Sequence, residues 1–121
     1  EHPSIKLVID IHRDALPRYA SVASIDGKNY AKVLFVVATD YDGFEKNVSF
    51  AEKLNSHLPS AITRGLSKGN GYPPIDFFNQ NLKENAILLE IGGTENTIEE
   101  VANTMNVVAK AIFETFEEEG R

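Results

Sequence analysis

The sequence predicts a three-layer α/β domain in which a mixed, mostly parallel sheet is flanked by helices. Two almost continuous apolar segments, Ile5–Ile11 and Ala86–Ile91, are typical of strands buried in the middle of such a sheet. Strand-like and helix-like segments follow one another along the chain, which favours a sheet covered by helices. The 121 residues correspond to a single domain, residues 1–121, without a repeat, a linker or a low-complexity segment.

The first third of the chain is expected to form strands. Ile5–Ile11 should be a central strand, and residues 12–21 should form a loop. The segments VASI and NYAKVLFVVA flank the turn-forming sequence Asp-Gly-Lys at 26–28, which predicts a β-hairpin. Val33–Ala38, in the second arm of that hairpin, is another continuous apolar run.

The middle of the chain predicts one helix and one short strand. Phe44 to Leu58 carries apolar residues at helical spacing and is followed by a proline. Ile62 to Ser67 should be a short strand. The segment KGNGYPP that follows is a loop by composition, and loops of this kind often lie near functional sites.

The last third predicts a strand followed by a long helix. The strand Ala86–Ile91 leads into a Gly-Gly pair. Asn96 to Glu99 then resembles a capping box, with Asn96 or Thr97 as the cap and Glu99 or Glu100 reaching back. Beyond it, the apolar residues from Ile98 onward form one stripe of an amphipathic helix.

Composition excludes several classes of function. The net charge of −6 argues against a nucleic-acid binder, because such proteins usually present a basic face to phosphate. No apolar segment of the sequence approaches the ~20 residues of a membrane span. Because the chain has no cysteine, a transition-metal site would have to use histidine and carboxylate ligands.

His12 and Glu90 are the candidate functional residues. They stand at or just past the ends of the two most apolar strands, and ligands of open α/β sheets bind where parallel strands end. If the two strands are parallel neighbours, both side chains emerge at the same edge of the sheet. A histidine with a nearby glutamate is the minimal set for zinc hydrolysis, in which the imidazole holds the metal and the carboxylate moves protons.

A structural interpretation of the same two residues is also open. A lone histidine after a strand is more often a hydrogen-bonded structural residue than a metal ligand. Glu90 is harder to explain in this way, because a carboxylate in an apolar strand is costly to bury unless it is paired or functional. Under the structural interpretation, Arg64 or Lys68 would be its ion-pair partner.

Several motifs, taken in order, resemble those of one protein family. They are IHRDA after an apolar strand, DGKNYAKVLFVVA, FEKN, TRGLSKG, FNQNL and AILLEIGGTENTIEE. Together they resemble the stage II sporulation protein P family, zinc-dependent N-acetylmuramoyl-L-alanine amidases of spore-forming Firmicutes that are related to cell-wall amidases with an EIG-x-x-x-N signature. The resemblance runs from Ser4 to about Ala111 and implies an amidase-like form of the α/β fold.

The resemblance implies roles for individual residues. His12, in the IHRD motif, would be a zinc ligand, and Glu90, in LLEIGG, would be the catalytic acid/base. Four further residues match family motifs and would support the site or bind substrate, namely Arg13, Arg64, Asn79 and Gln80.

The chain departs from the family pattern at its beginning. Family members carry two earlier zinc ligands, a histidine and a glutamate, upstream of IHRD, whereas only Glu1 and His2 precede the first strand here. The chain therefore resembles the C-terminal part of a cell-wall amidase catalytic domain, and we expect further sequence upstream. Since a zinc site normally takes three protein ligands and a water, we expect this chain alone to be inactive.

The activity implied for the parent protein is hydrolysis of the amide between N-acetylmuramic acid and L-alanine in peptidoglycan during engulfment. Glu90 would take a proton from the attacking water and pass it to the leaving amine. The resemblance also implies an extracytoplasmic, membrane-tethered protein that works with the sporulation lytic transglycosylase. The alternative is a non-catalytic, metal-free fragment of the same fold that binds peptidoglycan or another protein, which a zinc titration would distinguish.

Overall fold

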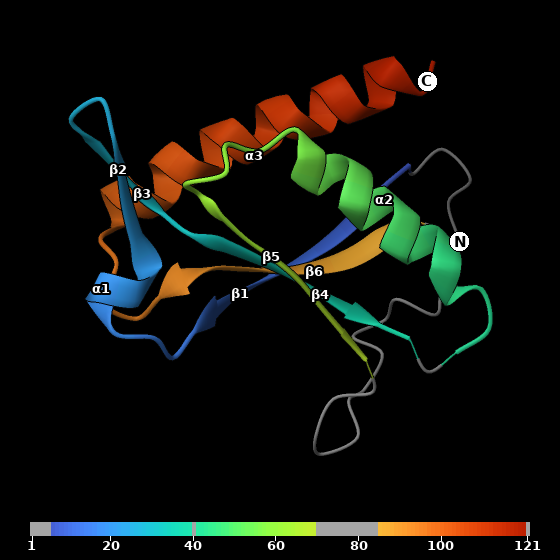
Figure 1. The fold of residues 1–121 in the computed structure, drawn as a ribbon, viewed down its shortest axis with the longest axis horizontal. Coiled ribbons are helices and arrows are strands. Elements are labelled where there is room, and N and C mark those ends of the chain that lie inside the picture. The colour runs from blue at the N-terminus through green and yellow to red at the C-terminus, as the bar shows by residue number, and fades with distance from the viewer. Residues whose placement is uncertain (1–5, 40, 70–84, 121) are drawn as a thin grey trace.

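The architecture is a mixed β-sheet with helices packed against it (Figure 1). The structure is a computed structural model that describes residues 6–39, 41–69 and 85–120. Its elements, in chain order, are β1 (Val8–Asp14), α1 (Arg18–Ser21), β2 (Val22–Ile25), β3 (Lys28–Ala31), β4 (Val33–Ala38), α2 (Phe44–Ser56), β5 (Thr63–Gly69), β6 (Ala86–Gly93) and α3 (Ile98–Glu118).

The main sheet has the strand order β1-β6-β4-β5. β1 runs parallel to β6 and β4 runs parallel to β5, whereas β4 and β6 are antiparallel. The predicted α/β fold class, with a mixed and mostly parallel sheet flanked by helices, is therefore confirmed. In the described residues the two long helices share one face of the sheet, so the predicted third layer is not found there. The prediction that Ala86–Ile91 is an internal strand is also confirmed, because β6 has a partner on each side.

The first strand does not lie where the sequence predicted. We expected Ile5–Ile11 to be central, but β1 is an edge strand of the described sheet and pairs with β6 alone. Two of its apolar side chains are well exposed, Val8 by 40% and Ile11 by 48%. An apolar run indicates a tendency to be buried, but it does not specify the neighbour that buries it. The predicted central position is therefore wrong for the described part of the chain.

The predicted hairpin is present, but its second arm is divided. β2 and β3 are antiparallel around Asp26 and Gly27, whose positive φ angles of 52° and 79° are those of a type I′ turn. Instead of continuing as one arm, the chain leaves the hairpin at Lys32. β4 then enters the main sheet between β5 and β6.

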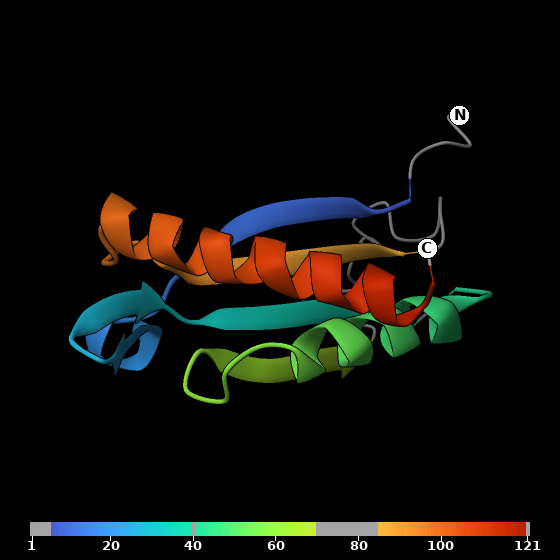
Figure 2. The same ribbon diagram turned by 90° about the horizontal axis from the view of Figure 1, so that it is seen from above.

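Both long helices pack against the same face of the sheet, and Figures 1 and 2 show them running along it. α2 begins at Phe44, as predicted, and ends at Ser56. α3 begins with the predicted capping box, in which Thr97 is the cap and Glu100 reaches back. None of the described helices is long and apolar enough to cross a membrane.

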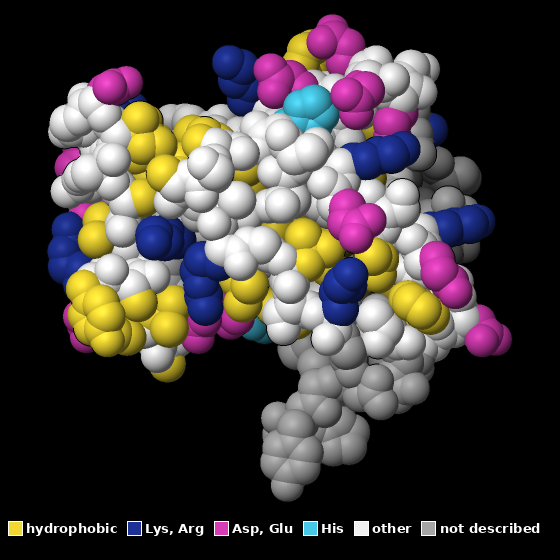
Figure 3. Space-filling model, viewed as in Figure 1, with side chains coloured by type: hydrophobic (Ala, Val, Ile, Leu, Met, Phe, Trp, Pro, Cys, Tyr) yellow, Lys and Arg dark blue, Asp and Glu magenta, His cyan; other side chains and the backbone are white. Residues whose placement is uncertain are grey.

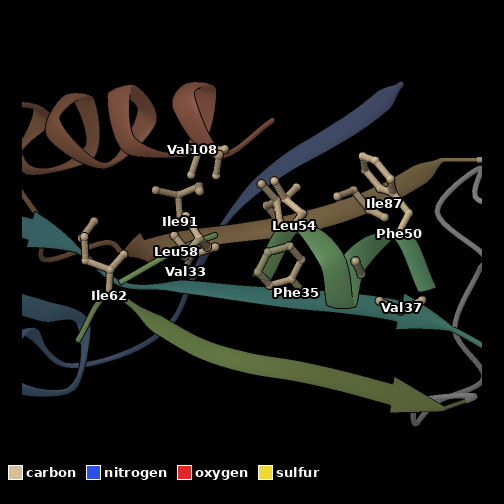
Figure 4. Packing of buried hydrophobic residues seen from close by; sticks show 14 residues of the cluster. Val33, Phe35, Val37, Phe50, Leu54, Leu58, Ile62, Ile87, Ile91 and Val108 are labelled. Carbon is tan, nitrogen blue, oxygen red and sulfur yellow. The ribbon is translucent and has the colours of Figure 1, made fainter. Parts of the chain in front are cut away.

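The core lies between these helices and the sheet (Figure 4). Alternate residues of β4 and β6 supply the sheet side, as expected when successive side chains of a strand point to opposite faces. The buried residues of the sheet and the two helices include Val33, Phe35, Val37, Ile87, Leu89, Ile91, Phe50, Leu54 and Val108. Since Leu89 and Ile91 point toward the helices, Glu90 between them points to the opposite face of the sheet.

Charged side chains of both signs lie on the face of the molecule that Figure 3 shows. On the face shown in Figure 3, lysine and arginine side chains lie among aspartate and glutamate side chains. Glu119, the residue that follows α3, pairs with Lys53 of α2 at 2.9 Å. Ion pairs of this kind tie the ends of the two helices together.

Candidate functional site

The register of β1 and β6 places His12 directly beside Glu90. Paired residues on neighbouring strands project to the same face, so both side chains lie on the face of the sheet opposite α2 and α3. The expected neighbourhood of the two residues is therefore found. Their expected position at the strand ends is wrong, because β1 continues to Asp14 and β6 continues to Gly93, and these two residues still pair.

Glu90 is a partly buried carboxyl group with a raised pKa. Burial raises the pKa of Glu90, and the negative charge of Asp14 raises it further. The positive charge of Arg64 acts in the opposite direction, as does that of a protonated His12. A carboxyl group whose pKa is raised holds a proton more readily than an exposed glutamate, which is the direction that suits a general acid/base.

The cations predicted as structural partners of Glu90 pair with other residues. Arg64 Nη1 lies 3.0 Å from Asp14 Oδ2, in an ion pair that connects β5 to β1. Lys68 Nζ lies 3.8 Å from Glu52 Oε2. Within the described ranges, no ion pair or hydrogen bond is formed by the Glu90 side chain. Under the structural interpretation, Glu90 therefore has no direct ion pair with Lys68 or Arg64 and keeps only the longer-range charge of Arg64.

His12 is held by a carboxylate on its own strand. Its Nε2 lies 3.0 Å from Oδ1 of Asp10, and the two side chains are 43% and 41% exposed. Asp10 and His12 are two residues apart on a strand, which places both on the face that carries Glu90. A carboxylate in this position orients an imidazole ring and selects which of its nitrogens carries a proton.

The described residues do not by themselves fit a zinc ion. A zinc site normally takes three protein ligands and a water. Over residues 6–39, 41–69 and 85–120, no group of three or more histidine, aspartate or glutamate side chains is arranged to hold a metal ion. His12, Asp10 and Glu90 are near neighbours in the sheet but fall short of such a group.

The other predicted site residues are distributed differently. Arg64 lies close enough to Glu90 to affect its pKa, so it shares the site. Arg13 instead donates from Nη2 to the backbone carbonyl of Asn96 at 2.9 Å, in the connection between β6 and α3. Asn79 and Gln80 lie outside the described residues.

Two acidic members of this face were missed in the sequence. Asp10 and Asp14 lie on either side of His12 along β1, each two residues away. Their spacing of two is the signal that could have identified them, since alternate residues of a strand share a face. Asp14 contributes to the site both by raising the pKa of Glu90 and by pairing with Arg64.

A shallow groove of about 200 Å³ adjoins the site at the edge of the sheet. It runs between β1 and the start of α3, and most of its lining is apolar. The residues that line it are Ile11, His12, Arg13, Ile91, Ile98 and Val101. His12 therefore lies between this apolar groove and the polar face that carries Glu90.

Comparisons with known proteins identify one family. The family model described as Stage II sporulation protein P (SpoIIP) matches residues 1–113. A relative from Bacillus subtilis (strain 168), named Stage II sporulation protein P, is 36% identical over 119 residues. That match covers 93% of this chain but only 29% of the relative, so the chain spans less than a third of the length of that protein. No solved structure matches the chain.

Proposed function

Because this chain belongs to the stage II sporulation protein P family, which gives it a role in sporulation, we propose that it is part of a peptidoglycan hydrolase. The bond cleaved in this proposal is the amide between N-acetylmuramic acid and L-alanine. The observation that carries the proposal is the pairing of His12 with Glu90 on one face of the sheet. A partly buried carboxyl group beside an imidazole is suited to proton transfer during amide hydrolysis.

Glu90 is the general acid/base in this proposal. Its raised pKa makes the carboxylate a better proton acceptor than an ordinary surface glutamate. Glu90 would take a proton from the attacking water, and the resulting carboxylic acid would give that proton to the nitrogen of the leaving amine. Asp14 favours the protonated state and Arg64 favours the ionised one, so the two residues together set how readily the proton moves in each direction.

His12 would be one ligand of a zinc ion in this proposal, and the remaining protein ligands would come from outside the described residues. The described residues fall short of the three ligands that zinc normally takes. Asp10, 3.0 Å from the imidazole, would orient His12 for this role, as carboxylates do for many metal-binding histidines.

The remaining predicted residues would act on substrate or on the shape of the site. Arg64 is a candidate for binding a substrate carboxylate, because its guanidinium lies at the site and is 28% exposed. Arg13 contacts the β6–α3 connection, so we assign it to supporting the site and not to binding substrate. Asn79 and Gln80 remain candidates for substrate binding on the basis of their motif.

The cellular setting of this activity follows from the substrate. Peptidoglycan lies outside the cytoplasm, so the proposal places the protein there. Membrane tethering, a role in engulfment and partnership with the sporulation lytic transglycosylase belong to the proposal for the whole protein, of which this chain is a part.

The test is hydrolysis of purified peptidoglycan by the full-length protein. We expect it to release stem peptides with a new N-terminal L-alanine, to contain about one zinc per chain, and to lose activity when a chelator removes the metal. The alternative function is non-catalytic binding, in which the protein would sediment with peptidoglycan but release no stem peptides. Binding without release, by a full-length protein loaded with zinc, would contradict the amidase proposal.

A further inference from the structure

Glu100 is an almost completely buried carboxylate at the start of α3, with 4% of its surface exposed. Burying such a group is costly unless charge and hydrogen bonds compensate for the lost water. Arg18 supplies the charge, with both terminal nitrogens of its guanidinium donating to Glu100, one of them at 2.8 Å. Asn96 Nδ2 and the Thr97 backbone nitrogen also donate, at 3.1 and 3.0 Å.

These contacts keep Glu100 ionised. The Arg18 guanidinium is the main cause that lowers the pKa of Glu100, to about 2, against the opposing effect of burial. Thr97 and Asn96 lower it further. The carboxylate is therefore a permanent negative charge inside the protein, and the groups around it are held by charge-assisted hydrogen bonds.

From Glu100 the network reaches the turn that follows Glu90. The Asn96 side chain donates to Glu100, and its Oδ1 accepts from the backbone nitrogen of Gly93 at 2.7 Å. Gly92 adopts a φ of +64°, and a Cβ at this residue would lie 2.2 Å from Asn96 Oδ1. The turn after Glu90 is thus packed directly on Asn96, with no room for a side chain between them.

The same network reaches the end of β1 that carries His12. Arg13, the next residue, donates from Nη2 to the Asn96 carbonyl at 2.9 Å. The pairing of β1 with β6 becomes irregular between His12 and Asp14. The ladder is disrupted there and resumes at the Asp14–Gly93 pair, so contacts outside the ladder add to what fixes the two strands. The Arg13–Asn96 hydrogen bond is one such contact.

We propose that Glu100 is a positioning residue of the site, which holds the turn after Glu90 and the end of β1 after His12 in a fixed relation through Asn96. This inference rests on the proposed function, because it concerns the relative position of His12 and Glu90, the two residues proposed to act on the substrate. Glu100 acts through other residues and is not assigned a contact with substrate. Loosening it should let the two strand ends move independently.

The test compares Glu100→Gln with Glu119→Gln in the full-length protein. Glu100 lies in the first turn of α3, and Glu119 is the residue just after its last turn. Both side chains are largely buried and both pair with a cation, which for Glu119 is Lys53. Arg18→Lys is a milder second variant, since it keeps the positive charge but not the two-pronged geometry of the guanidinium. Hydrogen exchange of backbone amides is measured over residues 12–15 and 91–97.

Glu100→Gln should accelerate amide exchange in both segments by roughly tenfold, the scale of a lost buried hydrogen bond. Arg18→Lys should do so to a smaller extent, and Glu119→Gln should leave both segments unchanged. In the hydrolysis assay, Glu100→Gln should lower kcat by roughly tenfold and leave KM within about twofold, because substrate-binding groups are untouched.

Two results would overturn the inference. One is exchange within twofold of wild type at both segments in Glu100→Gln and Arg18→Lys. The other is an equal acceleration in Glu119→Gln, which would indicate general loosening of the fold. If the wild-type protein hydrolyses nothing, the proposed function fails, but the exchange measurement still decides whether Glu100 positions the two strand ends.

Discussion

His12 of β1 and Glu90 of β6 are paired residues of two parallel strands, on the face of the sheet opposite the two long helices. The pairing brings an imidazole next to a carboxyl group whose pKa burial and Asp14 raise. Residues that are distant in sequence thereby form one chemical unit. The predictions below separate the roles of its members.

Glu90→Gln in the full-length protein should reduce peptidoglycan hydrolysis by roughly 10²-fold or more, the usual scale for a general acid/base. The substitution keeps the size of the side chain and removes its ability to carry a proton. Zinc content, measured by mass spectrometry of the metal, should stay near one per chain, because Glu90 is not assigned as a ligand. Glu52→Gln is the control, since Glu52 is an exposed glutamate paired with Lys68. Release of stem peptides at near the wild-type rate would mean that Glu90 is structural.

The same substitution should increase stability at neutral pH. A group whose pKa is raised in the folded state contributes stability below its unfolded pKa, and that contribution is lost as the pH rises through the folded pKa. Above that pH, ionised Glu90 opposes folding, and a neutral glutamine does not. We expect Glu90→Gln to raise the melting temperature by about 1–3 °C at pH 7–8, and the gain to disappear below about pH 4. A lower melting temperature at pH 7 would instead identify Glu90 as an ion-pair partner.

His12→Ala should abolish both zinc binding and hydrolysis in the full-length protein, because the substitution removes a ligand and leaves the site incomplete. This pattern differs from that of Glu90→Gln, which should lose only hydrolysis. His57→Ala is the matched control, since His57 lies near Glu114 and Glu118 on α3, away from β1. A His12→Ala protein with one tightly bound zinc would show that this residue is not a ligand.

The 121-residue chain alone should bind zinc weakly and should not hydrolyse peptidoglycan. Residues 6–39, 41–69 and 85–120 offer too few ligands to satisfy the charge and coordination of the ion, so water would have to complete its shell. Isothermal titration calorimetry at neutral pH measures this directly. One-to-one binding with a sub-micromolar dissociation constant would contradict the prediction and would imply that another residue of the chain serves as a ligand.

The sequence predicts those features of the fold and site that depend on residues close together in the chain, and it predicts less well those that depend on residues far apart. The Asp26–Gly27 turn and the capping box of Thr97 and Glu100 were predictable, because both depend on residues close together in the chain. The fold class followed from apolar runs that require burial. The edge position of β1 could not be predicted, since it depends on which strands lie beside it rather than on its own residues.

The site shows the same limit. Glu90 was identifiable because a carboxylate inside an apolar strand needs an explanation, and His12 because it follows such a strand. The pairing of Arg64 with Asp14, rather than with Glu90, depends on the curvature and register of the sheet. The contact of Arg18 with Glu100 joins two segments far apart in the chain, and no local pattern in either segment indicates it.

The pairing of buried Glu100 with the partly exposed Arg18 should make the protein sensitive to acid. The pKa of Glu100 is lowered to about 2 in the folded state, so its contribution to stability is present above its ordinary pKa and is lost as the pH falls from about 4.5 toward about 2. Glu100→Gln should cost on the order of 1–2 kcal/mol in the free energy of unfolding at pH 7, because a neutral amide replaces the carboxylate that accepts the hydrogen bonds of Arg18, Asn96 and Thr97. Urea denaturation at a series of pH values should show the difference in unfolding free energy between wild type and Glu100→Gln decreasing across that pH range.

Arg18→Gln, which removes the main cause of the lowered pKa, should make the unfolding free energy depend less on pH over the same range. A difference between wild type and Glu100→Gln that stays constant from pH 7 to pH 2 would mean that the carboxylate is not ionised by its pairing with Arg18, and that its hydrogen bonds to Asn96 and Thr97 hold the start of α3 without the help of charge.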